Sequence, residues 1–324
     1  MIKAGIIGGA GYTGGETLRL LLRHPEVTIA FVHSKSQAGK AVAQVHTDLV
    51  GETDIVFTGE LSTDVDVLFL CVGHGEAKVF LSENELPEHI KIIDLSQDFR
   101  LAAANDAQPV PFVYGLPEVN REKIQQASRI ANPGCFATAL QLGLLPLAAN
   151  GLLETVYATG ITGSTGAGQS LQASSHFSWR ANNIQAYKTL THQHMAEIGE
   201  TLQQLSNTTI VPINFVPWRG DFARGIFATL QMHCTTSKEH LYELYEQYYA
   251  AHPFTQVSRG AIHMKQVVNT NKCLIQPEQE GDQLAVHVTI DNLLKGASGQ
   301  AVQNMNLMFG LEETTGLQLK ASFF

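Results

Sequence analysis

The glycine-rich turn GGAGYTG at residues 8–14 constrains the fold of this chain more than any other feature. It joins a short apolar run to a segment whose leucines recur at helical spacing. Gly8, Gly11 and Gly14 allow a tight turn in which the backbone approaches a pyrophosphate and the helix N-terminus supplies unpaired N–H groups. A strand, this turn and a helix predict a dinucleotide-binding βαβ unit. The alternative is a tight turn without a ligand.

Apolar runs of strand length predict the rest of a parallel sheet. They lie at residues 3–8, 27–32, 66–73 and 90–96. Strands that alternate with helices form parallel sheets, whose central strands are apolar on both faces because helices cover both.

The pattern changes after Cys135 to longer, partly alternating strands. Such strands are typical of a mixed or antiparallel sheet that carries helices on one face. The expected strands are 225–233, 272–277 and 284–292, with an amphipathic helix at 238–252. We therefore predict an α/β protein of two domains whose boundary lies close to Cys135.

The segment after the second predicted strand indicates which dinucleotide would bind. NAD sites place a carboxylate about 20 residues beyond the glycines to bind the ribose 2′-hydroxyl. Here the chain reads HSKSQAGK and offers Ser34, Lys35 and Ser36 but no acidic side chain. Hydroxyls and an ammonium suit a 2′-phosphate, which favours NADP(H) over NAD. The alternative is a solvated loop.

Cys135 is the candidate nucleophile. It follows Asn132-Pro133-Gly134 and opens the apolar segment CFATALQLGLLPLAA, which is predicted to be a helix. The positive end of the helix dipole favours thiolate over thiol at this position. The other cysteines, Cys71, Cys234 and Cys273, are predicted to be structural. Without C-x-x-C pairs, the cysteines predict neither disulfides nor a metal site.

His192 and His194 are the candidate proton partners of this thiol. They precede a helix expected to begin near Met195, and two residues apart they do not share a helical face. One can therefore reach the thiol while the other binds substrate. A zinc pair is disfavoured because no third and fourth ligands lie nearby in the sequence.

A second glycine tract, GSTGAGQS at 163–170, has the outline of a phosphate-binding loop. A kinase would carry lysine where this chain has Gln169, which argues against nucleoside triphosphates. Its backbone amides and hydroxyls suit a substrate phosphate, and a lid or a subunit contact is the alternative. A dinucleotide site, an activated cysteine and a histidine together match thiol-dependent reduction of an acyl phosphate through a thioester.

Charge and composition narrow the class of partner. The formal charge of −9 disfavours nucleic acid and anionic membranes, since both attract basic surfaces. No secretory signal is visible at the start of the sequence, and the longest apolar stretch is too short to span a bilayer. We expect a cytoplasmic protein that acts on a small molecule.

Several motifs resemble those of one enzyme family in both sequence and order. They are GGAGYTGGE, HSKSQAGK, DLSQDFR, YGLPEVNR, NPGCFATALQL, THQHMAEI and GQAVQNMNLMFGL. Along nearly its whole length the chain is similar to the N-acetyl-γ-glutamyl-phosphate reductase family of arginine biosynthesis, which is related to aspartate-semialdehyde dehydrogenase.

The resemblance implies a fold and an activity. The expected fold is a Rossmann-like, doubly wound parallel sheet over 1–134, completed by a C-terminal helix at 299–324. An α+β catalytic and dimerisation domain with a mixed sheet is expected over 135–298. The implied reaction is NADPH-dependent reductive dephosphorylation of N-acetyl-γ-glutamyl phosphate to the 5-semialdehyde, by a homodimer or homotetramer that binds this substrate and phosphate.

The resemblance also assigns roles to residues. Cys135 is the nucleophile and His192 is favoured as the acid or base. The residues expected to bind substrate are His194, Arg100, Ser164, Arg219 and Arg224. The residues expected to hold the cofactor are Gly8, Gly11, Tyr12, Thr13, Gly14, Ser34, Lys35, Ser36, Gly166 and Asn304.

Other activities stay open at this point. The tract reads TGSTGAGQS where relatives often have SGVSGAGR, so a basic residue is missing beside the substrate. Arg219 or Arg224 is expected to supply this charge, and an N-succinyl group is an alternative to acetyl. Aspartyl phosphate is the nearest rival substrate. A non-catalytic dinucleotide sensor and a cysteine hydrolase are alternatives of other classes.

Overall fold

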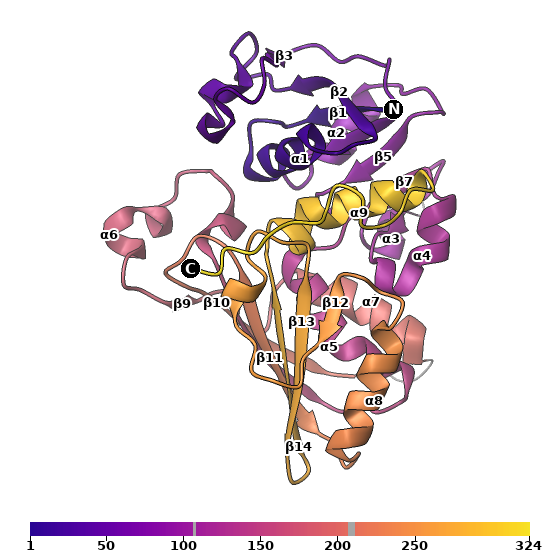
Figure 1. Ribbon diagram of the computed structural model, residues 1–324, viewed down its shortest axis with the longest axis vertical. Coiled ribbons are helices and arrows are strands. Elements are labelled where there is room, and N and C mark those ends of the chain that lie inside the picture. The colour runs from indigo at the N-terminus through magenta and orange to yellow at the C-terminus, as the bar shows by residue number, and fades with distance from the viewer. Residues whose placement is uncertain (106–107, 207–210) are drawn as a thin grey trace. The chain divides into compact units, whose positions relative to one another are not determined.

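The computed structural model describes residues 1–105, 108–206 and 211–324. The chain forms two compact units (Figure 1). Unit 1 comprises Met1–Gly134 and Ala297–Gln318, and unit 2 comprises Cys135–Gly296 and Leu319–Phe324. We expected a helix over 299–324 that completes the first domain, but the helix ends at Met308 and residues 319–324 belong to unit 2. The last residues are held in unit 2 because the backbone N–H of Ser322 donates to the carbonyl of Val268 at 3.1 Å.

Within the described residues, unit 1 contains a sheet of seven parallel strands in the order β3-β2-β1-β4-β5-β7-β6. The strands are β1 (Ile2–Ile7), β2 (Val27–His33), β3 (Phe57–Thr58), β4 (Val67–Leu70), β5 (Lys91–Asp94), β6 (Val113–Tyr114) and β7 (Arg129–Ala131). The strand order reverses between β1 and β4. In open parallel sheets the carboxyl ends of the strands at such a reversal are where ligands bind.

Unit 1 has five helices among its described residues. They are α1 (Tyr12–Leu22), α2 (Glu76–Glu83), α3 (Ala102–Asn105), α4 (Pro117–Gln126) and α9 (Gly299–Met308). Of these, α1, α4 and α9 contact the sheet. Two short turns, η1 (Val42–Gln44) and η2 (Thr47–Leu49), follow β2. Helix α9 packs against α1 and α4, and every one of its residues is buried. Its polar side chains therefore need internal partners, and Asn306 Nδ2, for example, donates to the carbonyls of Glu313 and Thr315.

Unit 2 has a mixed sheet with the order β12-β13-β14-β11-β8-β10-β9. Its strands are β8 (Val156–Thr162), β9 (Gln185–Ala186), β10 (Ile213–Arg219), β11 (Ile226–His233), β12 (Thr255–Val257), β13 (Cys273–Glu280) and β14 (Gln283–Ile290). Strands β8 and β10 are parallel, while β11 runs antiparallel to both β8 and β14. The predicted α/β fold class, with a doubly wound parallel sheet and a mixed sheet, is confirmed.

Helices cover one face of the mixed sheet (Figure 1). Helix α5 (Cys135–Ala149) packs on β11, β13 and β14, with α7 (His194–Ser206) and α8 (Lys238–Tyr249) beside it. The remaining short elements are η3 (Ser164–Ala167), η4 (Ala173–Ser175), α6 (Phe177–Arg180), η5 (Met264–Gln266) and η6 (Leu294–Ser298), the last a π-helical turn. Among the described residues, no helix combines the length and apolar character needed to cross a membrane.

A tyrosine hydroxyl supplies the hydrogen bond that a proline removes from helix α5. Pro146 lacks the N–H that would bond the carbonyl of Leu142 four residues earlier. The hydroxyl of Tyr249, on α8, donates to that carbonyl instead, and the hydroxyl of Tyr245 donates to the carbonyl of Gly143. Helix α5 therefore stays continuous, and residues 136–148 are all buried behind Cys135.

Candidate functional site

The glycine turn between β1 and α1 has the geometry expected for a dinucleotide. Gly8 has φ of +80°, and a Cβ on it would lie 2.4 Å from the carbonyl oxygen of Cys71. A Cβ on Gly14 would lie 2.5 Å from the carbonyl oxygen of Gly8. Only glycine fits either position, because one requires a left-handed backbone and both meet neighbouring backbone atoms. The turn follows β1, at the point where the strand order reverses.

The start of helix α1 presents backbone donors. Gly11 caps it without a side-chain hydrogen bond, and the first turn, which includes Tyr12 and Thr13, has no acidic residue. The first N–H groups of a helix have no partners within it, and they carry the positive end of the helix dipole. Among the described residues, the start of α1 and the glycines before it therefore suit a pyrophosphate.

The residues after β2 fit a phosphate better than a ribose hydroxyl alone. Ser34 is buried, and its Oγ lies 3.5 Å from the Oγ of Ser36, while Lys35 and Ser36 are exposed. Burial lowers the pKa of His33, and the positive charge of Lys35 adds to this effect. The segment offers hydroxyls and an ammonium where an NAD site would carry a carboxylate.

Cys135 is the first residue of α5 and is half-buried. A Cβ on Gly296, in the π-helical turn η6, would lie 2.8 Å from the Cβ of Cys135 and 3.2 Å from its Cα. The backbone at Cys135 is therefore packed closely against the backbone of η6. By contrast Cys71, Cys234 and Cys273 are buried, and burial raises the pKa of Cys71 to about 12.

His192 lies buried in an aromatic cluster within unit 2. Its ring centroid is 5.7 Å from that of Phe136, 5.6 Å from that of Phe215 and 5.8 Å from that of Tyr187. Burial lowers the pKa of His192 to about 4, and the charge of Lys188 adds to the shift. Its Nδ1 accepts the backbone N–H of His194 at 3.3 Å, so the neutral ring carries its proton on Nε2.

His194 stands beside a carboxylate. It is the first residue of α7, one position before the predicted start, and its Nε2 lies 3.9 Å from Oε1 of the buried Glu197. The two histidine rings are 4.5 Å apart, so both belong to one cluster.

Tyr187 connects this cluster to Arg219 and to Cys135. The guanidinium carbon of Arg219 lies 4.7 Å from the centroid of the Tyr187 ring. Burial raises the pKa of Tyr187, the charge of Cys135 raises it further, and Arg219 opposes both effects. The phenol is therefore neutral near pH 7 and lies within electrostatic range of the thiol.

Arg224 is already paired. Its Nε donates to Oδ2 of Asp291 at 3.0 Å and its Nη2 to Oδ1 at 3.2 Å. Asp291 is fully buried and also accepts the backbone N–H groups of Leu293 and Leu294. Arg224 therefore balances the buried charge of Asp291, which caps the turn beside Cys135. Arg219 is then the better candidate for binding a substrate anion.

The second glycine tract runs against the segment that carries Arg224. The backbone N–H of Ser164 donates to the carbonyl of Phe222 at 2.8 Å, and a Cβ on Gly163 would lie 2.4 Å from the carbonyl oxygen of Ala223. Ser164 is half-buried and Gly166 is exposed. The tract is thus a tight turn anchored by backbone hydrogen bonds.

Arg100 and Asn304 both hold the segment that leads to Cys135. In unit 1, the Nε of Arg100 donates to the carbonyl of Asn132 at 2.8 Å. Asn304 Nδ2 donates to Oδ1 of Asn132 and to the carbonyl of Gly115. Arg100 is buried, and its guanidinium group donates hydrogen bonds to backbone carbonyls. This position indicates that Arg100 stabilises the loop before the nucleophile.

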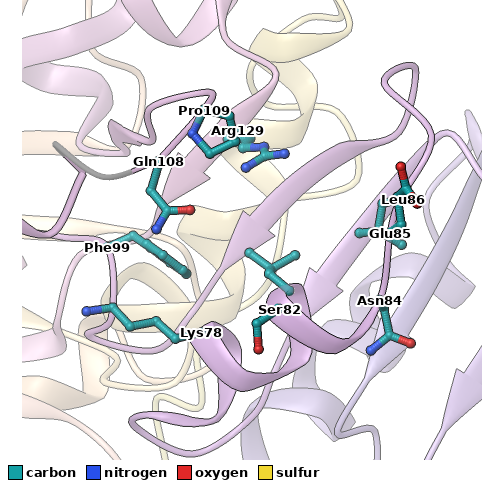
Figure 2. Close-up of a pocket in the computed structure, with 10 residues that line it drawn as sticks. Lys78, Ser82, Asn84, Glu85, Leu86, Phe99, Gln108, Pro109 and Arg129 are labelled. Carbon is teal, nitrogen blue, oxygen red and sulfur yellow. The ribbon is translucent and has the colours of Figure 1, made fainter.

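A separate cavity of about 360 Å³ lies in unit 1 (Figure 2). Lys78, Phe99 and Arg129 are among its lining residues, and the Lys78 ammonium lies 5.9 Å from the Phe99 ring. None of the predicted site residues lines this cavity. We assign no role to it.

Three residues of the site were missed by our sequence reasoning: Tyr187, Gly296 and Asp291. Tyr187 lies in the same motif region as the histidines, five residues before His192, and this proximity was the available signal. The roles of Gly296 and Asp291 depend on contacts with residues far away in the sequence, which no local pattern indicates.

Two family models match the chain. Residues 3–127 match the NAD binding domain of semialdehyde dehydrogenase, and residues 135–292 match the dimerisation domain of semialdehyde dehydrogenase.

Named relatives cover the whole chain. The N-acetyl-gamma-glutamyl-phosphate reductase of Phocaeicola vulgatus is 56% identical, and that of Christiangramia forsetii is 55% identical, each over 100% of both chains. Among solved structures, aspartate semialdehyde dehydrogenase II from Vibrio cholerae aligns with a TM-score of 0.72 at 18% identity, over 96% of this chain and 98% of the other. This structural likeness concerns the fold.

Proposed function

The chain belongs to the N-acetyl-γ-glutamyl-phosphate reductase family, and on this premise we propose that it reduces N-acetyl-γ-glutamyl phosphate to N-acetylglutamate 5-semialdehyde with NADPH, in arginine biosynthesis. The observation that carries the proposal is full-length identity of 56% to a reductase, combined with a half-buried cysteine at the first residue of α5.

Cys135 is the nucleophile of the proposed reaction. Its thiolate, favoured by the N-terminus of α5, attacks the acyl carbon, and the bond from that carbon to the phosphate oxygen breaks. The products of this step are a thioester on Cys135 and inorganic phosphate. NADPH, when bound, supplies the hydride that reduces the thioester, and the sulfur then leaves as thiolate.

The phosphate that leaves in the first step takes up a proton, whereas reduction of the thioester by hydride and release of the thiolate need none. We assign the transfer of this proton to the histidine pair. We expected His192 to move it, but a buried imidazole whose pKa is lowered to about 4 is a weak base at neutral pH. The Nε2 of His194 lies 3.9 Å from the Glu197 carboxylate, and on this geometry we propose His194 as the proton donor. His192 then orients the loop, since its Nδ1 accepts the backbone N–H of His194.

Most of the residues proposed to bind the cofactor belong to unit 1. Gly8, Gly11, Tyr12, Thr13 and Gly14 suit the pyrophosphate, and Ser34, Lys35 and Ser36 suit the 2′-phosphate. Gly166 and Asn304 are proposed to lie near the nicotinamide end. Ser164, Arg219 and His194 are proposed to bind substrate. Unit 2 is proposed to form the contacts of a homodimer or homotetramer, and the enzyme is proposed to act in the cytoplasm.

An assay in the phosphorylating direction tests this function. NADP reduction would be followed with inorganic phosphate and, side by side, the semialdehydes of N-acetylglutamate, N-succinylglutamate and aspartate. We expect phosphate-dependent turnover with an N-acylglutamate semialdehyde. The ratio of the turnover rates with the N-acetyl and the N-succinyl substrates identifies the acyl group. Preference for aspartate semialdehyde would contradict the proposal. NADPH binding without turnover on any of the three would indicate a sensor.

A further inference from the structure

The side chain of Arg180 reaches the backbone of Arg219 at the end of β10 in unit 2. Arg219 is the last residue of β10, and Arg180 is the last residue of α6. The Nη2 of Arg180 donates to the backbone carbonyl of Arg219 at 3.0 Å and to that of Asn183 at 3.2 Å. These bonds fix α6 and the end of β10 to each other, so the Arg180 side chain and the residue Arg219 belong to one cluster.

Both guanidinium groups retain donors that the described chain does not use. The Nε atoms of Arg180 and Arg219 are buried, and neither has a hydrogen-bond partner among the described residues. Asp221 is two residues from Arg219 in sequence, but its Oδ2 accepts the backbone N–H of Asn182. Buried donors left without acceptors are unfavourable, which indicates that the cluster is completed by an acceptor from outside the described chain.

The cluster lies on the side of the reactive thiol. Arg219 stacks on the Tyr187 ring at 4.7 Å, and Tyr187 contacts His192, whose ring centroid lies 5.7 Å from that of Phe136, the residue after Cys135. Anions are repelled by the net charge of −9, so an anionic substrate needs a local concentration of cations. A pair of guanidinium groups provides planar, bidentate recognition of a carboxylate or a phosphate.

We propose that Arg180 and Arg219 form a binding site for an anionic oxygen group of the substrate, either a carboxylate or the phosphate. Arg219 contacts the anion. Arg180 adds a second charge and positions Arg219 by holding its backbone carbonyl. The inference rests on the proposed function in that the ligand is the substrate of that reaction, and it adds a residue, Arg180, that the family resemblance did not assign.

The test compares Arg180→Met and Arg219→Met with the wild type in the phosphorylating assay. Loss of one charge-assisted contact is expected to raise one Michaelis constant by about ten-fold or more, with a smaller change in kcat. A raised KM for the semialdehyde assigns the site to a carboxylate, and a raised KM for inorganic phosphate assigns it to phosphate. Both constants unchanged within about two-fold in both variants would overturn the proposal.

A matched control and a measurement without turnover make the result specific. Arg259→Met removes an exposed arginine of unit 2 that pairs with Glu239 and Glu246, and it should change neither constant. Arg180→Lys keeps a charge, so partial recovery relative to Arg180→Met is expected, and it replaces Arg180→Met if that variant loses thermal stability.

Protection of Cys135 against iodoacetamide extends the test to the resting protein. Inorganic phosphate or the N-acetylglutamate semialdehyde should slow alkylation in the wild type and, at equal concentration, slow it less in the Arg180 variants. Equal protection by both probes in wild type and variants would overturn the site. A wild type that turns over none of the three semialdehydes would contradict the proposed function instead. In that case the protection measurement still shows whether Arg180 and Arg219 bind the anion.

Discussion

Gly296 leaves no room for a side chain beside Cys135. A Cβ on Gly296 would stand 2.8 Å from the Cβ of Cys135, and the backbone N–H of Gly296 is fixed by a 2.9 Å bond to the carbonyl of Asp291. Asp291 in turn is held by Arg224 and by the backbone of Leu293 and Leu294. The position of the proposed nucleophile, at the start of unit 2, therefore depends on residues at the other end of the sequence of unit 2.

Gly296→Ala tests this packing. The added methyl group must displace Cys135 or the turn, at a cost of about 1–3 kcal/mol in the free energy of unfolding. We expect a several-fold loss of kcat and an altered rate of Cys135 alkylation. Gly260→Ala is the matched control, because a Cβ at Gly260 meets no atom within 4 Å. Wild-type alkylation and turnover in Gly296→Ala would show that the contact does not position the thiol.

His192 should make stability depend on pH. Its pKa is lowered from 6.5 to about 4 in the folded protein, so on acidification the unfolded chain binds a proton first. The contribution of the neutral His192 to the free energy of unfolding is fully present above pH 6.5 and is lost as the pH falls to 4. The total loss is about 3 kcal/mol. Urea unfolding of His192→Asn between pH 7 and pH 4.5 should give a flatter profile than the wild type.

The exposed His89 provides the control for this measurement. His89→Asn should reproduce the wild-type pH profile. If His192→Asn and wild type lose stability in parallel over this range, then His192 is not held neutral by the fold.

Ser36→Asp tests the preference for NADP. A carboxylate at this exposed position would repel the 2′-phosphate and favour the ribose hydroxyl. We expect NADPH affinity to fall by about ten-fold, roughly the effect of one unfavourable charge contact, while NADH affinity is unchanged or increased. Tryptophan fluorescence or calorimetric titration measures both, with Ser62→Asp, at another exposed serine, as control. Equal losses for the two nucleotides would contradict the assignment.

The fold class was predictable because it depends on local patterns. The apolar runs at 3–8 and 27–32 correspond to β1 and β2, and the glycine turn precedes α1 as expected. The family resemblance rested on short motifs, and relatives of 51–56% identity confirm it. The burial of Cys71, Cys234 and Cys273 agrees with their prediction as structural residues.

The candidate site was only partly predictable, because its remaining members depend on long-range contacts. Arg224 looked like a substrate cation in sequence, yet Asp291, 67 residues later, pairs with it. His192 looked like an ordinary proton acceptor, but burial among Phe136 and Phe215 lowers its pKa. The contact of Arg180 with Arg219 depends on α6 and the end of β10 lying side by side, which no local sequence pattern indicates.

Turnover of Cys135→Ser is the most direct test of the account. The change replaces sulfur by oxygen at the first residue of α5 and leaves the glycine turn of unit 1 unaltered. We predict that phosphate-dependent NADP reduction falls by about a thousand-fold or more, as expected when a covalent nucleophile is lost, while NADPH affinity stays within about three-fold. Cys234→Ser, at a buried cysteine, should keep its turnover if it folds. Near-normal turnover in Cys135→Ser would contradict the thioester mechanism.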